Sequence, residues 1–314
     1  MLDVHEGLRV LLPTPVYEAI HPEWVNKVIV LWGSWLVFPC AAWLLWRVWR
    51  GGRSWSWARR VMAALWALLL LVFIDARFIE RYRITVQTAQ VPLGVPMRIA
   101  LISDTHIGLY KSPGYLLRVV DRLNELKPDA VLIAGDFTYE PDRSLDELMA
   151  PLSRLAMPAY SVPGNHDEQE PGPDLREPLR QALVRAGVRP IEYTHADLGG
   201  FTLVGLGDRF AHKDGLAPLL GAPRGKPIVL LMHNPDSVMQ LKPGMAALAL
   251  AGHTHGGQIR IPGLYKRVVP SIYGFDRGLH TWAPVPTYVS TGLGEIGLPM
   301  RWLVPPVIDL IDLR

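Results

Sequence analysis

Two long apolar runs near the start of the chain contrast with the short, interrupted apolar runs that follow them. Residues 28–46 carry no charge, and a second uncharged run covers 61–74. A helix of about 20 apolar residues spans a bilayer core, and a shorter run can span when flanking arginines extend toward the headgroups. The pattern predicts an N-terminal membrane anchor over 1–85, with a transmembrane helical hairpin of helices at about 25–49 and 59–79. The alternative is one membrane helix followed by an interfacial helix.

From residue 97 onward, short apolar runs end abruptly in polar clusters, and amphipathic stretches lie between them. The runs predict strands at 97–103, 130–134, 159–162, 201–206, 228–232 and 247–251, and the amphipathic stretches predict helices at 115–126, 145–155 and 175–186. Alternating strands and helices form a layered α/β domain. We therefore expect a catalytic domain over 97–314, preceded by a linker over 86–96 that contains two prolines.

The composition and charge of the chain are most informative in its first part, where they bear on the membrane anchor and its orientation. Nine of the eleven tryptophans precede residue 67, as expected of an interfacial aromatic belt, and no acidic residue occurs over 24–74. The basic loop 47–60 belongs in the cytoplasm by the positive-inside rule, which would place the catalytic domain on the opposite, periplasmic or extracellular side. Arg77, Arg81 and Arg83 beyond the second run weaken this asymmetry. The single cysteine, Cys40, excludes a disulfide framework and a thiolate metal site.

Polar side chains follow five of the predicted strands directly. Imidazole nitrogens together with carboxylate and amide oxygens suit divalent ions of the first transition row. The candidate metal ligands are Asp104, His106, Asp136, Asn165, His233, His253 and His255. Seven such ligands can hold two ions about 3.5–4 Å apart with a shared hydroxide between them. The sequence thus predicts two divalent metal ions as cofactors, and Mn, Fe, Zn and Ni all accept these ligands.

Each of these motifs has a structural explanation when it is taken alone. An Asp-x-His triplet arises by chance, a histidine at a strand end is often a hydrogen-bonded structural residue, and Gly-Asn favours turns. The conjunction favours a metal centre, because five of the ten histidines fall in these clusters and each cluster follows a predicted strand.

The ordered set of motifs resembles the calcineurin-like metallophosphoesterase superfamily. The matching elements are Asp104-Thr105-His106, Gly135-Asp136, Gly164-Asn165-His166-Asp167, His233 and Gly252-His253-Thr254-His255. The resemblance implies a four-layer α/β sandwich, in which two stacked mixed β-sheets are flanked by helices and the metals lie at one edge.

The resemblance also implies a role for each site residue. Asp104, His106 and His255 would hold the first ion, Asn165, His233 and His253 the second, and Asp136 would bridge both. His166 would be a catalytic residue that stabilises the transition state or protonates the leaving group, and Asp167 would orient it.

Residues 288–294 and 298–301 resemble a membrane-anchored bacterial branch of the superfamily. This implies a bacterial inner (plasma) membrane protein that hydrolyses a phosphodiester or a lipid-linked phosphate of the cell envelope. One alternative is a UDP-2,3-diacylglucosamine pyrophosphatase of lipid A synthesis with a cytoplasmic site, and another is a non-catalytic scaffold. The net charge of +3 and the lack of a basic and aromatic groove predict no nucleic-acid partner.

Four loop residues after strands are candidates for substrate contact. These are Tyr110, Lys111, Asp208 and Arg209. The alternative is that they are ordinary solvated loop residues, because charged and polar side chains in loops usually face water.

Overall fold

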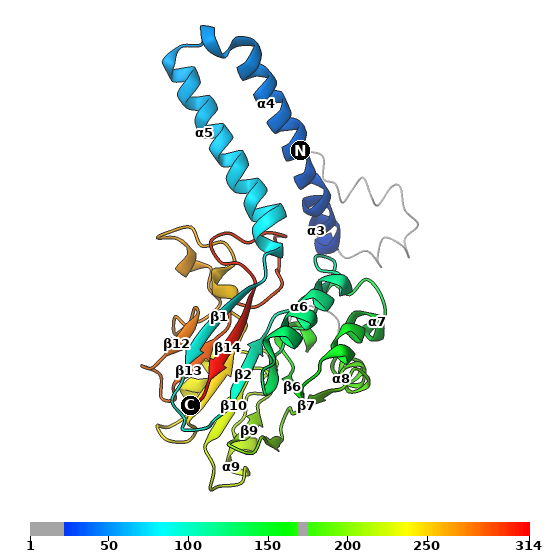
Figure 1. The fold of residues 1–314 in the computed structure, drawn as a ribbon, viewed down its shortest axis with the longest axis vertical. Helices are drawn as coiled ribbons and strands as arrows, with labels where there is room; N and C mark the ends of the chain where they lie inside the picture. Colours follow the sequence, from blue (N-terminus) through cyan, green and yellow to red (C-terminus); the bar gives the residue numbers. More distant parts are fainter. Residues whose placement is uncertain (1–21, 169–174) are drawn as a thin grey trace. The chain divides into compact units, whose positions relative to one another are not determined.

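The computed structural model describes residues 22–168 and 175–314, which fall into two compact units (Figure 1). The first unit extends to Phe78 and includes Gly297–Pro299. The second unit comprises Ile79–Ile296 and Met300–Arg314 and contains every described strand.

The first unit consists of two antiparallel helical arms. One arm joins α3 (Pro22–Gly33) to α4 (Val37–Gly51) through a short 3-10 turn, and α5 (Trp57–Ile74) forms the other arm. The apolar helical spans Asn26–Gly51 and Trp57–Tyr82 have 26 residues each and are long and apolar enough to cross a membrane. At 1.5 Å per residue, each exceeds the roughly 30 Å of a bilayer core. The predicted helical hairpin is therefore confirmed as a pair of candidate membrane helices.

The two arms are joined by polar and aromatic contacts near the end of α5. Arg77 Nε donates a hydrogen bond to Ser34 Oγ at 2.9 Å, and Arg77 Nη2 donates to the carbonyl oxygen of Leu31 at 3.0 Å. The Phe78 ring lies 5.1 Å from the Trp35 ring, centroid to centroid. A guanidinium within an apolar span needs such partners, because an unpaired charge in hydrocarbon is costly.

The second unit is built on two six-stranded mixed sheets. Their strand orders are β1-β14-β2-β4-β6-β7 and β12-β13-β11-β10-β9-β8. The first sheet contains β1 (Thr85–Gln90), β14 (Val307–Asp312), β2 (Arg98–Ile102), β4 (Ala130–Ala134), β6 (Ala159–Val162) and β7 (Val188–Pro190). The second contains β12 (Gly278–His280), β13 (Thr287–Val289), β11 (Leu248–Ala251), β10 (Ile228–Leu231), β9 (Thr202–Gly205) and β8 (His195–Asp197). The short strands β3 (Ile107–Gly108) and β5 (Thr138–Tyr139), which follow β2 and β4 along the chain, form a separate two-stranded sheet.

Alternation of side chains along the strands produces the layers. In β2, Ile99 and Leu101 share one buried cluster with Leu231 of β10 in the other sheet, whereas Ala100 and Ile102 belong to the cluster beneath the helices. Successive residues of a strand point to opposite faces, so a fully apolar strand supplies two cores at once. The expected two stacked sheets flanked by helices are confirmed.

Helices α6 (Pro113–Leu126), α7 (Leu145–Met149) and α8 (Arg176–Arg185) cover the outer face of the first sheet (Figure 1). On the second sheet the four-residue helix α9 (Ala217–Leu220) buries Leu219 in the outer cluster. The buried face of α6 carries Leu116, Val119, Val120 and Leu123, at the spacing of three and four residues that places side chains on one helix face.

Two expectations from the sequence are wrong. The predicted linker 86–96 begins with an ordered edge strand, because β1 pairs in parallel with β14, whose residues lie more than 200 positions away in the sequence. The predicted helix 145–155 is α-helical only to Met149 and continues as a 3-10 helix, Ala150–Arg154. Pro151 has no backbone N–H and therefore cannot continue the α-helical hydrogen-bond ladder.

Asp309 is a carboxylate buried in the core between the two sheets. Its neighbours in β14, Ile308 and Leu310, face the helices, so Asp309 points to the opposite side, where Tyr288 Oη donates it a hydrogen bond at 2.9 Å. Burial raises the pKa of Asp309 to about 7, against an unfolded value near 4. The folded state thus binds this proton more tightly, and the resulting stability, complete below about pH 4, is lost as the pH rises through 7.

Asp309→Asn is expected to stabilise the protein at pH 8 by a few kcal/mol, on the order set by that pKa difference, because the amide carries no charge to bury. Thermal unfolding of the detergent-solubilised chain at pH 5 and pH 8 measures this. The variant should show a smaller drop in Tm between the two pH values than the parent. The same change at the exposed Asp142 is the control. An unchanged pH dependence in Asp309→Asn would contradict the assignment.

Candidate functional site

The seven predicted ligands converge where strands of both sheets end. β2, β4 and β6 run parallel in the first sheet, and β10 and β11 run parallel in the second. The carboxyl ends of each set therefore meet at one edge. All seven side chains are buried. Ligand atoms of Asp104, His106 and His255 lie within 4.8 Å of one another, as do those of Asp104, Asp136 and His233.

The backbone around these residues is bent in an unusual way. Positive φ angles, between 45° and 69°, occur at Asp104, His106, Asp136, His253 and His255. Residues other than glycine rarely adopt this conformation, and it clusters at functional sites because the surrounding fold must hold it in place. Gly292 shows how tightly the site is packed, since a Cβ there would lie 2.7 Å from the Cβ of Asp104. The sequence gives no sign of this strain.

One group of side chains comprises Asp104, His106 and His255. The Nε2 atoms of the two histidines lie 3.2 Å apart, and His255 Nε2 lies 3.4 Å from Asp104 Oδ1. The Nδ1 atom of His106 faces the carbonyl oxygen of Thr138 at 3.3 Å. This is the group that the family resemblance implies for the first ion.

A second group comprises Asn165, His233 and His253. His233 Nε2 lies 3.0 Å from Asn165 Oδ1 and 3.1 Å from His253 Nδ1. Its Nδ1 faces the carbonyl oxygen of Ala134 at 2.7 Å. Three potential ligand atoms from three different strand ends thus point at one spot, in the combination implied for the second ion.

Asp136 lies between the two groups. Its Oδ2 atom is 3.5 Å from His106 Nε2 in the first group and 3.3 Å from His233 Nε2 in the second. Its Oδ1 atom accepts a hydrogen bond from the backbone N–H of His166 at 2.9 Å. A carboxylate in this position can contribute an oxygen to each of two neighbouring cations.

The protonation of the histidines suits metal binding. A carbonyl oxygen cannot donate, so the ring of His106 carries its proton on Nδ1 and directs the Nε2 lone pair into the cluster, and the ring of His233 does the same when it is neutral. Burial lowers the pKa of His106 and of His253 to about 3, so both rings are neutral, the form that binds metals. Facing lone pairs and buried carboxylates are stabilised by cations, and the residues present therefore fit divalent metals.

Asp104 and His233 show what the cluster gains from a cation. Burial, with a further contribution from Asp136, raises the pKa of Asp104 to about 6. Burial alone would lower the pKa of His233, but the carboxylates of Asp136, Asp104 and Asp208 together outweigh burial and raise that pKa well above its ordinary value. A metal ion in this place would supply the positive charge that the His233 proton otherwise provides.

His166 and Asp167 border the cluster. The half-buried ring of His166 lies 5.1 Å from the His106 ring, centroid to centroid, so it can reach a group held at the metals. Asp167, which was expected to orient His166, accepts hydrogen bonds from the backbone N–H groups of Phe137 and Gly164, each at 3.0 Å. These contacts hold together the loops that carry Asp136 and Asn165, and the orienting role of Asp167 stays a prediction.

The candidates for substrate contact lie in other environments. Lys111 is buried and forms a 3.0 Å ion pair with Glu295, which also pairs with the buried Arg81 at 3.0 Å. Asp208 is buried and accepts a hydrogen bond from the backbone N–H of Phe210 at 2.7 Å. The solvated-loop alternative is therefore wrong for Lys111 and Asp208, because both side chains are buried, and their substrate role stays a prediction.

The structure also identifies supporting residues that the sequence reasoning did not assign. Arg301 is fully buried, and its Nη2 donates to the carbonyl oxygens of Thr291 and Gly294 at 2.8 and 2.7 Å and lies 3.4 Å from His255 Nδ1. It thus holds the loop that packs on Asp104. In the sequence, the only indication of this role is that Arg301 belongs to the stretch 298–301, which resembles the membrane-anchored branch of the superfamily.

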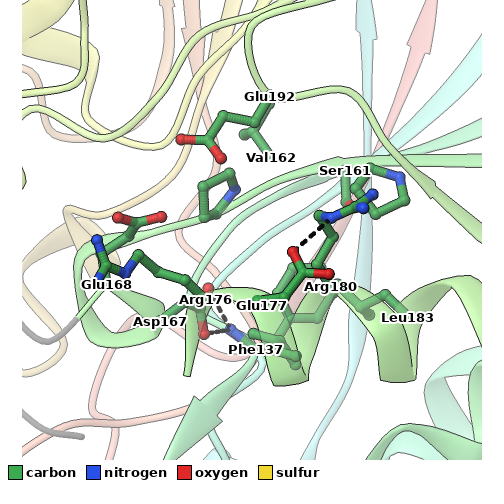
Figure 2. A pocket seen from close by; sticks show the side chains of 13 residues that line it. Phe137, Ser161, Val162, Asp167, Glu168, Arg176, Glu177, Arg180, Leu183 and Glu192 are labelled. Atoms are coloured by element: carbon green, nitrogen blue, oxygen red, sulfur yellow. Dashed lines mark hydrogen bonds and ion pairs between the residues drawn. The ribbon is translucent and has the colours of Figure 1, made fainter. Parts of the chain in front are cut away.

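A cavity of about 130 Å³ lies beside β6 and α8, with Asp167, Glu168, Arg180 and Glu192 on its walls (Figure 2). Figure 2 shows the Asp167 carboxylate bonded to the Phe137 backbone and Arg180 bonded to Glu177. None of the seven clustered side chains lines this cavity. We therefore assign it no catalytic role.

Comparison with known proteins agrees with this geometry. The family model for calcineurin-like phosphoesterases matches residues 97–257, half of the chain. An uncharacterized metallophosphoesterase of Helicobacter pylori (strain ATCC 700392 / 26695) is 31% identical over 227 residues, which cover 69% of this chain but only 60% of that protein. Phosphodiesterase YaeI of Escherichia coli (strain K12) is 28% identical over 229 residues, covering 69% of this chain and 82% of that protein.

The name of a third relative includes both a metallophosphoesterase domain and the word transmembrane. The transmembrane protein with metallophosphoesterase domain of Danio rerio is 31% identical over 227 residues, covering 65% of this chain and 50% of that protein. Two apolar helices of sufficient length accompany the domain in the present chain as well. The chain belongs to the calcineurin-like phosphoesterase family, and its described residues include two candidate membrane helices.

Proposed function

We propose that the protein is a membrane-anchored phosphodiesterase that uses two divalent cations to hydrolyse a phosphodiester or a lipid-linked phosphate. Asp104, His106 and His255 would hold one cation, Asn165, His233 and His253 the other, and Asp136 would contribute to both. The observation that supports this most directly is the position of Asp136, whose Oδ2 lies within 3.5 Å of one imidazole nitrogen from each group.

The chemistry follows from the residues. Two divalent cations, when bound, stabilise negative charge on phosphoryl oxygens and make water a better nucleophile at neutral pH. The seven side chains fix the positions at which the cations would bind, and their burial keeps bulk water away from those positions. His166 would hold a proton near the leaving-group oxygen and deliver it as the phosphoester bond breaks.

The test is metal analysis of the purified full chain together with a substrate screen. We expect about two equivalents of Mn, Fe, Zn or Ni and turnover of bis-p-nitrophenyl phosphate that a chelator abolishes and a divalent ion restores. Phosphomonoesters and lipid pyrophosphates in the same screen separate the substrate classes. A chain that binds these metals but turns over none of the substrates would favour the non-catalytic scaffold instead.

We also propose that residues 1–85 anchor the protein and that the catalytic domain faces the periplasm or cell exterior. The basic loop between the two apolar helices supports this orientation, because such loops remain in the cytoplasm. A topology reporter fused after Arg314 tests it. A cytoplasmic reporter would reverse the orientation and favour the UDP-2,3-diacylglucosamine pyrophosphatase alternative.

A further inference from the structure

A loop of the catalytic unit exposes an unusual amount of apolar surface. This segment, residues 258–273, is called here the apolar loop. Its exposed large apolar side chains are Ile261, Leu264, Val268, Ile272 and Tyr273, with relative exposures of 44%, 51%, 65%, 77% and 45%. Exposed apolar side chains gathered on one segment are typical of a surface that binds another protein, a ligand or a membrane.

The charges on the apolar loop are all positive. It carries Arg260, Lys266 and Arg267 and no acidic residue, and both Lys266 and Arg267 are exposed. The two form a short 3-10 helix with Tyr265, between Leu264 and Val268. Basic residues interleaved with apolar ones are typical of surfaces that lie in the headgroup region of anionic bilayers.

The base of the apolar loop is tied to the segment at the end of the second apolar span. Arg260 N donates to Trp302 O at 2.9 Å, and Trp302 N donates to Gln258 O at 3.1 Å. The next residue, Leu303, donates its N–H to Glu80 Oε2 at 3.0 Å. Glu80 belongs to the apolar span Trp57–Tyr82, at its C-terminal end. This contact, which lies within the second unit, ties the base of the apolar loop to the residues that end the span.

The apolar loop also borders the metal-ligand segment. Thr254, between His253 and His255, donates its hydroxyl to the carbonyl oxygen of Asp276 at 2.7 Å, just beyond the loop. A Cβ on Gly257 would lie 3.3 Å from the side chain of Val269. A molecule or surface that binds the apolar loop would therefore lie beside the cluster of seven predicted metal ligands.

We propose that the apolar loop docks on the anionic phospholipid surface of the membrane that anchors the chain, and so presents the catalytic site to substrates in that surface. This inference rests on the proposed membrane anchoring. A bilayer fits the loop better than a second copy of the chain does, because its exposed basic pair lies between exposed apolar residues and its base contacts a residue at the end of an apolar span. Pro262, Gly263 and Pro270 leave it too irregular to pair as a strand edge.

The test is site-specific fluorescence of the full chain reconstituted in vesicles. Cys40, the only cysteine, is replaced by serine, and single cysteines are placed at Val268 or Ile272 and labelled with an environment-sensitive dye. Leu220→Cys, at a comparably exposed position of α9, is the matched control, and Leu69→Cys in α5 reports on the anchor. Lipids with a quencher attached to the acyl chain report contact with the bilayer.

We expect labels at Val268 and Ile272 to be blue-shifted and quenched by the lipid quencher, with the label at Leu220 unaffected. The quenching should be stronger in vesicles that contain phosphatidylglycerol than in phosphatidylcholine alone, and the pair Lys266→Gln and Arg267→Gln should remove that difference. A blue shift without lipid quenching, dependent on protein density, would indicate self-association and overturn the proposal.

The anchor label and an activity measurement separate this inference from the proposed function. Quenching at Leu69 without quenching at Val268 and Ile272 would leave the anchor intact and overturn the docking. No quenching at Leu69 would overturn both. Turnover of the soluble bis-p-nitrophenyl phosphate in the same vesicles tests the catalytic proposal by itself, and Val268→Asn with Ile272→Asn should leave that turnover unchanged.

Discussion

Replacing Asp136 by asparagine is expected to remove bound metal and phosphoesterase activity together. The amide preserves the shape of the side chain but loses the negative charge that contacts an imidazole of each ligand group. Stabilisation of phosphoryl charge by metal ions is worth several kcal/mol, so turnover should fall by a factor of about 10³ or more. Inductively coupled plasma mass spectrometry and turnover of bis-p-nitrophenyl phosphate measure the two effects on one preparation.

The matched control for this variant is Asp309→Asn, which makes the same chemical change at another buried carboxylate of the same unit. It should keep its metal and its turnover, because Asp309 contacts Tyr288 rather than the cluster. Circular dichroism of both variants confirms that the fold is retained. Full metal occupancy and turnover in Asp136→Asn would refute the bridging position of this residue.

His166→Ala is expected to lower kcat by about 10²- to 10⁴-fold, the usual contribution of a general acid, while metal content stays near that of the parent. The two effects separate because His166 contacts Asp136 through its backbone N–H, which the substitution leaves in place. Its ring lies beside the ring of His106, where it can reach a bound phosphoester.

A histidine of the same unit outside the cluster provides the control for that experiment. His195 in β8 lies in none of the ligand groups, and His195→Ala should leave both kcat and metal content unchanged. Substrates with better leaving groups need less protonation, so the loss in His166→Ala should shrink as the leaving group becomes more acidic. Metal loss in parallel with activity would show that His166 supports the ligands instead of the proton transfer.

The seven clustered side chains could be predicted from the sequence because their signal is local. Short apolar runs followed by Asp104, Asp136 or His253 identify strand ends, and parallel strands bring such ends to one edge. The prediction of the two stacked sheets came from the family resemblance. The structure adds the strained backbone of these residues and the carbonyl partners of His106 and His233, which depend on segments distant in sequence.

The sequence by itself determined the two apolar helices, the layered α/β class and the identities of the seven clustered side chains, because hydrophobic period and residue chemistry are properties of neighbouring positions. Only the tertiary structure showed that β1 is part of a sheet, that Lys111 and Asp208 are buried, and that Asp167 bonds the backbone. It also revealed the apolar loop as an exposed surface. Pairing and burial depend on contacts between distant segments, and β1 meets β14 across more than 200 residues, so no local pattern encodes them.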